Sequence, residues 1–181
     1  MLELRVQIEI RSVAPKWVSH RHVRMIVEKV MQTSEELLRK IVARDGIRDL
    51  SDRYCDCIWR NDIEALVSLF TEDGTFIVEG LEMEATARGP AQLRKVYKKA
   101  ISEMEPRLFI HSQVIKLVDE NRATGRCYSE VFSAKLKLQR VGLGYYEDEY
   151  AKVGAEWKFA SRRYFLDTID TEVSLRRTFM V

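Results

Sequence analysis

Cysteine is scarce in this sequence, whose 181 residues include only Cys55, Cys57 and Cys127. So small and odd a set does not build a disulfide framework, and it suits a reducing compartment. Cys55 and Cys57 resemble a metal pair, but on a helix residues two apart point in different directions, and no second pair of cysteines or histidines follows. The sequence therefore predicts neither disulfides nor a metal site.

Long apolar runs and an excess of either charge are also missing. There is no stretch of about 18 apolar residues and no basic-then-apolar leader, so we expect no membrane span and no signal peptide. The 30 Lys and Arg residues are interspersed with 28 Asp and Glu residues, which gives a net charge of +2 without a basic stripe. This pattern does not support nucleic-acid binding, and we expect a cytoplasmic protein.

The sequence does have enough apolar residues for one core. Hydrophobic residues make up 46% of the chain, and its length fits a single domain. The chain is organised around residues 47–80, where a helical stripe is followed by Asp62 as the N-cap of a second helix, a turn at 72–74 and a strand at 75–78. The stripe consists of Ile47, Leu50, Tyr54, Cys57 and Ile58.

The second half of the chain predicts one helix and then long strands. Gly89-Pro90 opens the helix, because proline is tolerated in the first helical turn, and Pro106 ends it. Strand candidates follow at 107–118, 122–139 and 144–169, with a turn at 119–121 and another at 154–155. Helices followed by long strands predict an α+β fold, in which a curved antiparallel sheet wraps around N-terminal helices and forms a cone with an internal cavity.

The first 30 residues have a different pattern. Apolar and polar residues alternate at 2–10, as in a strand, and Ala14-Pro15 interrupts the alternation. We interpret 1–30 as an appended arm or an over-extended gene start, with a flexible tail as an equal alternative, and 31–181 as the domain. His20 and His22 could in principle bind metal, but solvated tail histidines are far commoner.

A helical pattern begins at about Ser34. Its apolar face runs towards Asp45-Gly46 and is expected to pack before the central helix. The face consists of Leu37, Leu38, Ile41 and Val42.

Residues 47–80, Gly89-Pro90 and the final stretch GYYEDEYAKVGAEWKFASRRYFLD together resemble the SnoaL-like branch of the nuclear-transport-factor-two-like superfamily. The resemblance covers roughly residues 35–169 and is more specific for fold than for activity. That superfamily includes polyketide cyclases, scytalone dehydratase, ketosteroid isomerase, bile-acid dehydratase, a hexachlorocyclohexane dehydrochlorinase and the β subunits of ring-hydroxylating dioxygenases. Members commonly dimerise through the open face of the sheet, so the resemblance implies a homodimer.

In the resembled enzymes the pocket chemistry is proton transfer by a histidine that an aspartate orients, with a tyrosine as hydrogen-bond donor. The resemblance assigns the tyrosine to Tyr54 and the histidine, as base, to His111. The aspartate is not matched, because Trp59 stands five residues after Tyr54, where the carboxylate belongs. Asp56 could substitute for it from a shifted position, although an exposed helix carboxylate is the simpler interpretation.

Other positions of the family pattern also depart from it. Val131 stands where the bile-acid dehydratases place a carboxylate, with Glu130 on the opposite strand face, and Leu166 replaces an arginine of the last strand. We expect Trp59, Tyr146, Val131 and Val78 to contact a substrate. Arg162 or, preferably, Arg163 is expected to pair with Asp148 or with an acidic ligand, the pair with Asp148 being the commoner explanation. Phe76, Trp157 and Phe159 are interpreted as core.

Two functions remain open at this point. The first is a cofactor-independent dehydratase, isomerase or cyclase that binds a hydroxylated cyclic or aromatic compound and uses His111 as base. The second is non-catalytic, either a ligand-binding protein or an assembly subunit like the dioxygenase β subunits. A cavity on which His111, Tyr54 and Tyr146 converge favours the first, and a cavity plugged by Trp59 favours the second.

Overall fold

The computed structural model describes residues 20–80 and 83–168. The chain divides into two compact units, residues 1–43 and 44–181, and each is described by itself. In the first unit, the described residues are helical. The strand expected at 2–10 lies outside the described residues.

The long helix α2 spans His20–Arg60. It joins the helical pattern that begins at about Ser34 and the central helix into one element, which continues through Asp45-Gly46. Gly46 lies within the helix and packs closely against Trp157. A Cβ at this position would lie 3.1 Å from Cδ1 of Trp157, so the absence of a side chain permits this packing. The stripe predicted for the central helix, from Ile47 to Ile58, is buried as expected.

The earlier apolar face of α2 does not pack as predicted. Its four members are among the most exposed large apolar residues of the described chain, with exposed fractions of 56–63%. They are Leu37, Leu38, Ile41 and Val42.

A second helix and then a strand follow α2, as the sequence indicates. The turn predicted at 72–74 is wrong, because residues 70–80 form one strand, with a register irregularity between Phe70 and Thr75. Helix α3 spans Ile63–Ser68, and Oδ1 of Asp62 accepts a hydrogen bond from the backbone N–H of Ala65 at 3.0 Å, which confirms the N-cap. Strands β1 (Phe70–Gly80) and β2 (Met83–Arg88) follow. Helix α4, Gly89–Met104, has its proline in the first turn.

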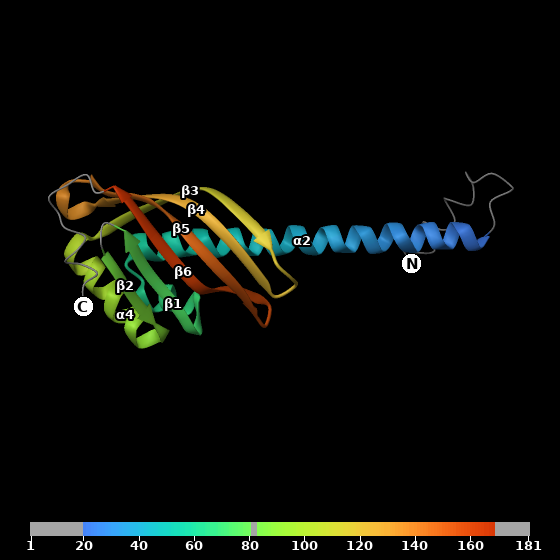
Figure 1. Ribbon diagram of the computed structural model, residues 1–181, viewed down its shortest axis with the longest axis horizontal. Helices are drawn as coiled ribbons and strands as arrows, with labels where there is room; N and C mark the ends of the chain where they lie inside the picture. Colours follow the sequence, from blue (N-terminus) through green and yellow to red (C-terminus); the bar gives the residue numbers. More distant parts are fainter. Residues whose placement is uncertain (1–19, 81–82, 169–181) are drawn as a thin grey trace. The chain divides into compact units, whose positions relative to one another are not determined.

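Four further strands complete a six-stranded sheet (Figure 1). They are β3 (Pro106–Leu117), β4 (Arg122–Ser133), β5 (Gln139–Val153) and β6 (Glu156–Thr168), and the strand order is β2-β1-β6-β5-β4-β3. The single strand expected at 122–139 ends at Ser133, where the short 3₁₀ helix η1 (Ala134–Leu136) follows. The α+β fold is confirmed, and one detail differs: β1 pairs with β6 in parallel, so the sheet is mixed.

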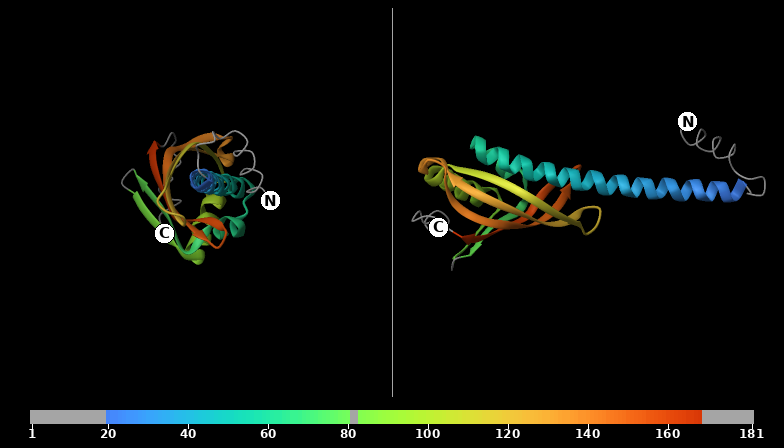
Figure 2. Two further views of the ribbon diagram at one scale, coloured as in Figure 1. Left: turned by 90° about the vertical axis from the view of Figure 1, so that its right-hand side faces the viewer. Right: turned by 90° about the horizontal axis from the view of Figure 1, so that it is seen from above.

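Within the second unit, the sheet curves around the part of α2 beyond residue 44 (Figure 2). Helix α4 packs against β1 and β2. The core lies between the inner face of the sheet and these helices, and Phe76, Trp157 and Phe159 belong to it, as predicted. Among residues 20–80 and 83–168, no helix is long and apolar enough to cross a membrane.

Candidate functional site

A small cavity inside the cone is lined by four tyrosines. Its volume is about 50 Å³. Tyr54 comes from α2, Tyr97 from α4, Tyr146 from β5 and Tyr164 from β6, so both layers of the fold contribute. The rest of the wall carries no charged side chain and consists of Ile58, Phe76, Ala100, Met104, Pro106, Leu108 and Val131.

Two of the four tyrosines contact each other through their hydroxyls, and the other two stack their rings. The hydroxyls of Tyr54 and Tyr97 are 3.1 Å apart, and the rings of Tyr146 and Tyr164 stack with their centroids 4.8 Å apart. Burial raises the pKa of all four phenols. They therefore stay protonated and can donate hydrogen bonds to an oxygen of a bound molecule.

A buried arginine lies against these rings. The guanidinium carbon of Arg162 is 4.1 Å from the ring centroid of Tyr54, 4.0 Å from that of Tyr146 and 4.3 Å from that of Phe159. Its side chain is fully buried and is not part of the cavity wall. Such cation–π contacts stabilise a cation that has lost its water.

Arg162 has a buried counter-charge. Its Nε lies 3.3 Å from Oδ1 of Asp148, and Oδ2 of Asp148 accepts a hydrogen bond from the Tyr150 hydroxyl at 2.9 Å. The preference for Arg163 as the partner of Asp148 is wrong, since Arg162 is the residue directly opposite Asp148 in the β5–β6 pair and both face inward. Arg163 points to the other face and pairs with Glu79 at 2.6 Å.

The polar network extends from Tyr150 on β5 to strand β3 and helix α2. Nε2 of Gln113 donates to the Tyr150 hydroxyl at 3.1 Å and to Oγ of Ser51 at 2.8 Å. Gln113 and Ser51 were not among the residues predicted for the site. A signal for Ser51 was available, because it is one residue after Leu50 and three before Tyr54 on the buried side of α2.

Burial changes the protonation of this network. It raises the pKa of the Asp148 carboxyl to about 6, although Arg162 and Tyr150 act in the opposite direction. Burial is the largest effect on the Arg162 guanidinium and lowers its pKa, but Asp148, Cys127, Tyr54 and Tyr146 together raise the pKa above its usual value. Burial also raises the pKa of the Cys127 thiol to about 11, so this thiol stays protonated.

Asp148 should make the free energy of unfolding depend on pH in a way that is absent from the Asp148→Asn variant. Its usual pKa is 3.8, so between about pH 4 and 6 the native state binds more protons than the unfolded state. Its stabilising contribution is complete below pH 4 and is lost as the pH rises through 6. We expect the free energy of unfolding of wild type, minus that of Asp148→Asn, to increase from pH 7 to pH 4 in urea titrations. A decrease over that range would mean that the pKa of Asp148 is lowered instead.

The structure places His111 outside the cavity, contrary to expectation. It lies at an irregularity of β3 between Ile110 and Gln113, where its side chain is 51% exposed and its Nε2 is 3.4 Å from Oε2 of Glu130. Such a β-bulge changes which side chains face inward, and here it turns Gln113 into the core in place of the histidine. His111 therefore does not converge with Tyr54 and Tyr146.

Asp56, the expected substitute for the missing aspartate, and Trp59, which stands at its position, also lie elsewhere. Asp56 is exposed and sits 3.4 Å from Arg60 one turn later on α2. Trp59 is 40% exposed, its Nε1 donates to the carbonyl of Leu108 at 2.7 Å, and its ring packs against Phe109. Neither is among the residues that line the cavity, so Asp56 does not replace the carboxylate and Trp59 does not plug the space.

Of the other residues that were expected to contact a substrate, two line the cavity and one belongs to the core. Tyr146 and Val131 line the cavity, whereas Val78 is buried without reaching it. Glu130 is on the outer face with His111, as strand alternation predicts. Among the described residues, no group of three or more His, Cys, Asp or Glu side chains is arranged to hold a metal ion.

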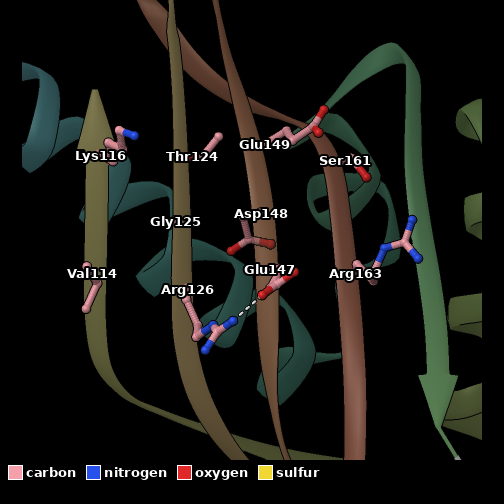
Figure 3. Close-up of a pocket in the computed structure, with 10 residues that line it drawn as sticks. All are labelled: Val114, Lys116, Thr124, Gly125, Arg126, Glu147, Asp148, Glu149, Ser161 and Arg163. Carbon is pink, nitrogen blue, oxygen red and sulfur yellow. Dashed lines mark hydrogen bonds and ion pairs between the residues drawn. The ribbon is translucent and has the colours of Figure 1, made fainter. Parts of the chain in front are cut away.

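A second, shallower pocket of about 410 Å³ lies on the outer face of the sheet (Figure 3). Arg126 and Glu147 form an ion pair across it, and Lys116, Glu149 and Arg163 also line it. Its charges are mixed in sign, so this pocket does not select one charged class of ligand.

Comparison with known proteins agrees with this architecture. The family described as "SnoaL-like domain" matches residues 39–163. No match was found among the curated proteins. A solved structure of Rv3472 from Mycobacterium tuberculosis, whose function is unknown, is 29% identical, with a TM-score of 0.62 and coverage of 81% of this chain and 80% of that one.

Two similar structures from Novosphingobium aromaticivorans carry different assignments. One is provisionally assigned as a scytalone dehydratase, with 21% identity, a TM-score of 0.63 and coverage of 75% of this chain and 91% of that one. The other is provisionally assigned as the β subunit of an aromatic-ring-hydroxylating dioxygenase, with 20% identity, a TM-score of 0.63 and coverage of 75% and 96%. At these identities the two structures agree with this chain in fold alone.

Proposed function

Since this chain belongs to the family of SnoaL-like domains, we propose that it binds a small cyclic or aromatic compound, through an oxygen of that compound, in the tyrosine-lined cavity. The observation that carries the proposal is the convergence of four protonated phenols in a wall that is otherwise apolar. An apolar wall with a few polar groups at one end is typical of sites that orient small molecules.

Binding here does not depend on a histidine–aspartate pair. No imidazole or carboxylate lines the cavity, and the nearest buried carboxylate, Asp148, is engaged by Arg162 and Tyr150. Phenol hydroxyls in a dry site donate well to a carbonyl, hydroxyl or phenolate oxygen. The ligand that fits this chemistry is a cyclic ketone or a phenol.

The size of the cavity limits the ligand. Pockets for drug-sized molecules have volumes of roughly 300–1,000 Å³, and this one has about 50 Å³. Met104 in its wall has a flexible thioether side chain that can adopt other rotamers. We therefore propose a compact ligand whose oxygen reaches the tyrosines while Met104 moves aside.

Tyr54→Phe should weaken binding while preserving the fold. Losing one buried hydrogen bond costs about 1 kcal/mol, so we expect roughly a five- to tenfold higher dissociation constant for the best ligand from a panel of phenols and cyclic ketones. Titration calorimetry or ligand-observed NMR measures it. Tyr128→Phe, on the exposed outer face, and His111→Ala should bind as wild type does. Equal weakening in Tyr128→Phe, or no binding by wild type, would contradict the proposal.

Catalysis by the same cavity is the second candidate. Arg162 lies under the ring of Tyr54, and its positive charge favours negative charge developing at an oxygen bound there, as in an enolate. Dehydration, isomerisation or cyclisation would then use a tyrosine as donor to that oxygen. Because no carboxylate or imidazole lines the cavity, a water molecule bound beside the compound would accept the carbon-bound proton. Proton exchange from the bound compounds in heavy water, followed by NMR, would be lost in Tyr54→Phe and kept in His111→Ala. Loss in His111→Ala would instead favour the histidine as base.

The assembly alternative has support on the outer face of the sheet. Tyr145 and Phe165 stack with their ring centroids 4.9 Å apart, and Tyr128 lies beside Tyr145. We propose that this outer aromatic row, Tyr128, Tyr145 and Phe165, contacts a second copy of the chain.

A further inference from the structure

Residues 26–42 of α2 carry an apolar stripe that the proposed function does not use. Seven large apolar side chains on this stretch have exposed fractions between 38% and 63%: Ile26, Val30, Met31, Leu37, Leu38, Ile41 and Val42. With about 100° of rotation per residue, they fall within an arc of about 160° on one side of the helix. Val27 falls within the same arc but is buried, so the exposed face is interrupted at that residue. An exposed apolar face of this extent is typical of an interaction surface.

We propose that this stripe pairs with the same stripe of a second copy of the chain, with the two helices antiparallel. Ile26, Val30, Leu37 and Ile41 are spaced by four, seven and four residues. This spacing is unchanged when the sequence is reversed. A two-fold axis between Thr33 and Ser34 therefore places Ile26 opposite Ile41 of the second copy and Val30 opposite Leu37 of the second copy. By symmetry, each of these contacts occurs twice in the dimer.

The two charged residues Glu28 and Arg39 do not interrupt this alignment. With about 100° of rotation per residue, they fall on the side of the helix opposite Ile26, Val30, Leu37 and Ile41. Glu28 pairs with Arg24 within its own helix at 2.8 Å.

The area is sufficient for a stable contact. If each of the seven side chains buries roughly 100 Å², two copies remove on the order of 1,400 Å² from water, which is within the range of specific protein interfaces. A second copy also fits better than a membrane surface, because acidic residues are interleaved with the basic ones. The charged residues here are Arg21, Arg24, Glu28, Lys29, Glu35, Glu36, Arg39 and Lys40.

The mass of the full-length protein provides the first test. Leu37→Glu with Ile41→Glu should halve the mass measured by light scattering or sedimentation and should weaken self-association at least tenfold. Gln32→Glu with Gln7→Glu, which adds the same charge outside the stripe, should leave the mass unchanged. An unchanged mass for the stripe variant overturns the proposal, as does a monomeric wild type. Loss of binding to phosphatidylcholine–phosphatidylglycerol vesicles without a change in mass would assign the stripe to membranes instead.

Cysteine cross-linking tests the direction of pairing and separates this contact from the outer aromatic row. A mixture of Val30→Cys and Leu37→Cys chains should form a disulfide dimer on mild oxidation, and neither variant alone should do so above the wild-type background. Tyr145→Glu, in the outer aromatic row, should leave this cross-link intact. Cross-linking of Val30→Cys to itself would indicate parallel helices, and loss of the cross-link in Tyr145→Glu would place the contact on the sheet. Either result overturns the proposal.

Discussion

Replacing Arg162 by methionine is expected to lower the free energy of unfolding by about 3–5 kcal/mol, the usual cost of removing one partner of a buried ion pair. Methionine fills a similar volume, but it leaves the Asp148 carboxylate buried without its counter-charge. It also removes the cation from its contacts with Tyr54, Tyr146 and Phe159. Urea unfolding at pH 7.5 measures the loss.

The neighbouring residue offers a matched control. Arg163 forms a shorter ion pair with Glu79, but both side chains are 40% exposed. Because water screens such a pair, Arg163→Met should cost less than about 1 kcal/mol. Adding Asp148→Asn to Arg162→Met should recover part of the lost stability, since no buried charge then remains. Equal losses in the two methionine variants would show that burial does not determine the strength of these pairs.

Gly144→Ala should be the most damaging of the conservative glycine substitutions. A Cβ at this position would overlap the backbone carbonyl oxygen of Phe165 and lie 3.0 Å from Cε2 of Tyr164. Gly144 lies at a register irregularity where β5 meets β6, so the collision can be relieved only by separating the two strands. We expect a loss of more than about 3 kcal/mol, or no folded protein, measured by thermal unfolding and soluble yield.

Gly154 is the control for this prediction. It has a φ of +64°, and nothing lies within 4 Å of a Cβ built on it. Gly154→Ala therefore costs only backbone strain, about 1 kcal/mol. If both variants were destabilised to the same extent, close approach between strands would not be the reason that position 144 is glycine.

The sequence predicted the fold well because its signals are local and mutually consistent. The helical stripe from Ile47 to Ile58, the cap at Asp62 and the proline at position 90 each act within one or two turns. The glycine at position 46, within α2, has a tertiary reason. Packing against Trp157 requires a small residue there, and α2 continues through it. No pattern within residues 40–50 reveals a tryptophan more than a hundred residues away.

The site was predicted less well, because the resemblance assigns His111 by its place in the family pattern and does not show which face of the strand it occupies. At the bulge in β3 the histidine lies outside and Gln113 lies inside. Tyr97 and Tyr164 were not identified as site residues. Tyr54 and Tyr146 were placed correctly because the elements that carry them are regular. Arg162 was considered as the partner of Asp148, but Arg163 was preferred.

The parallel pairing of β1 with β6 affects how the chain can fold during synthesis. Phe70 lies beside Phe159 and Val78 beside Tyr164, so strands made far apart in time become neighbours. Until the ribosome has released β6, β1 has only β2 as a hydrogen-bonding partner, and its other edge is exposed. Forming this long-range contact requires a large loop to close, which makes folding slow compared with that of a hairpin. A chain released before residue 156 would keep that edge open to other nascent chains, so complete translation is itself a condition for avoiding aggregation.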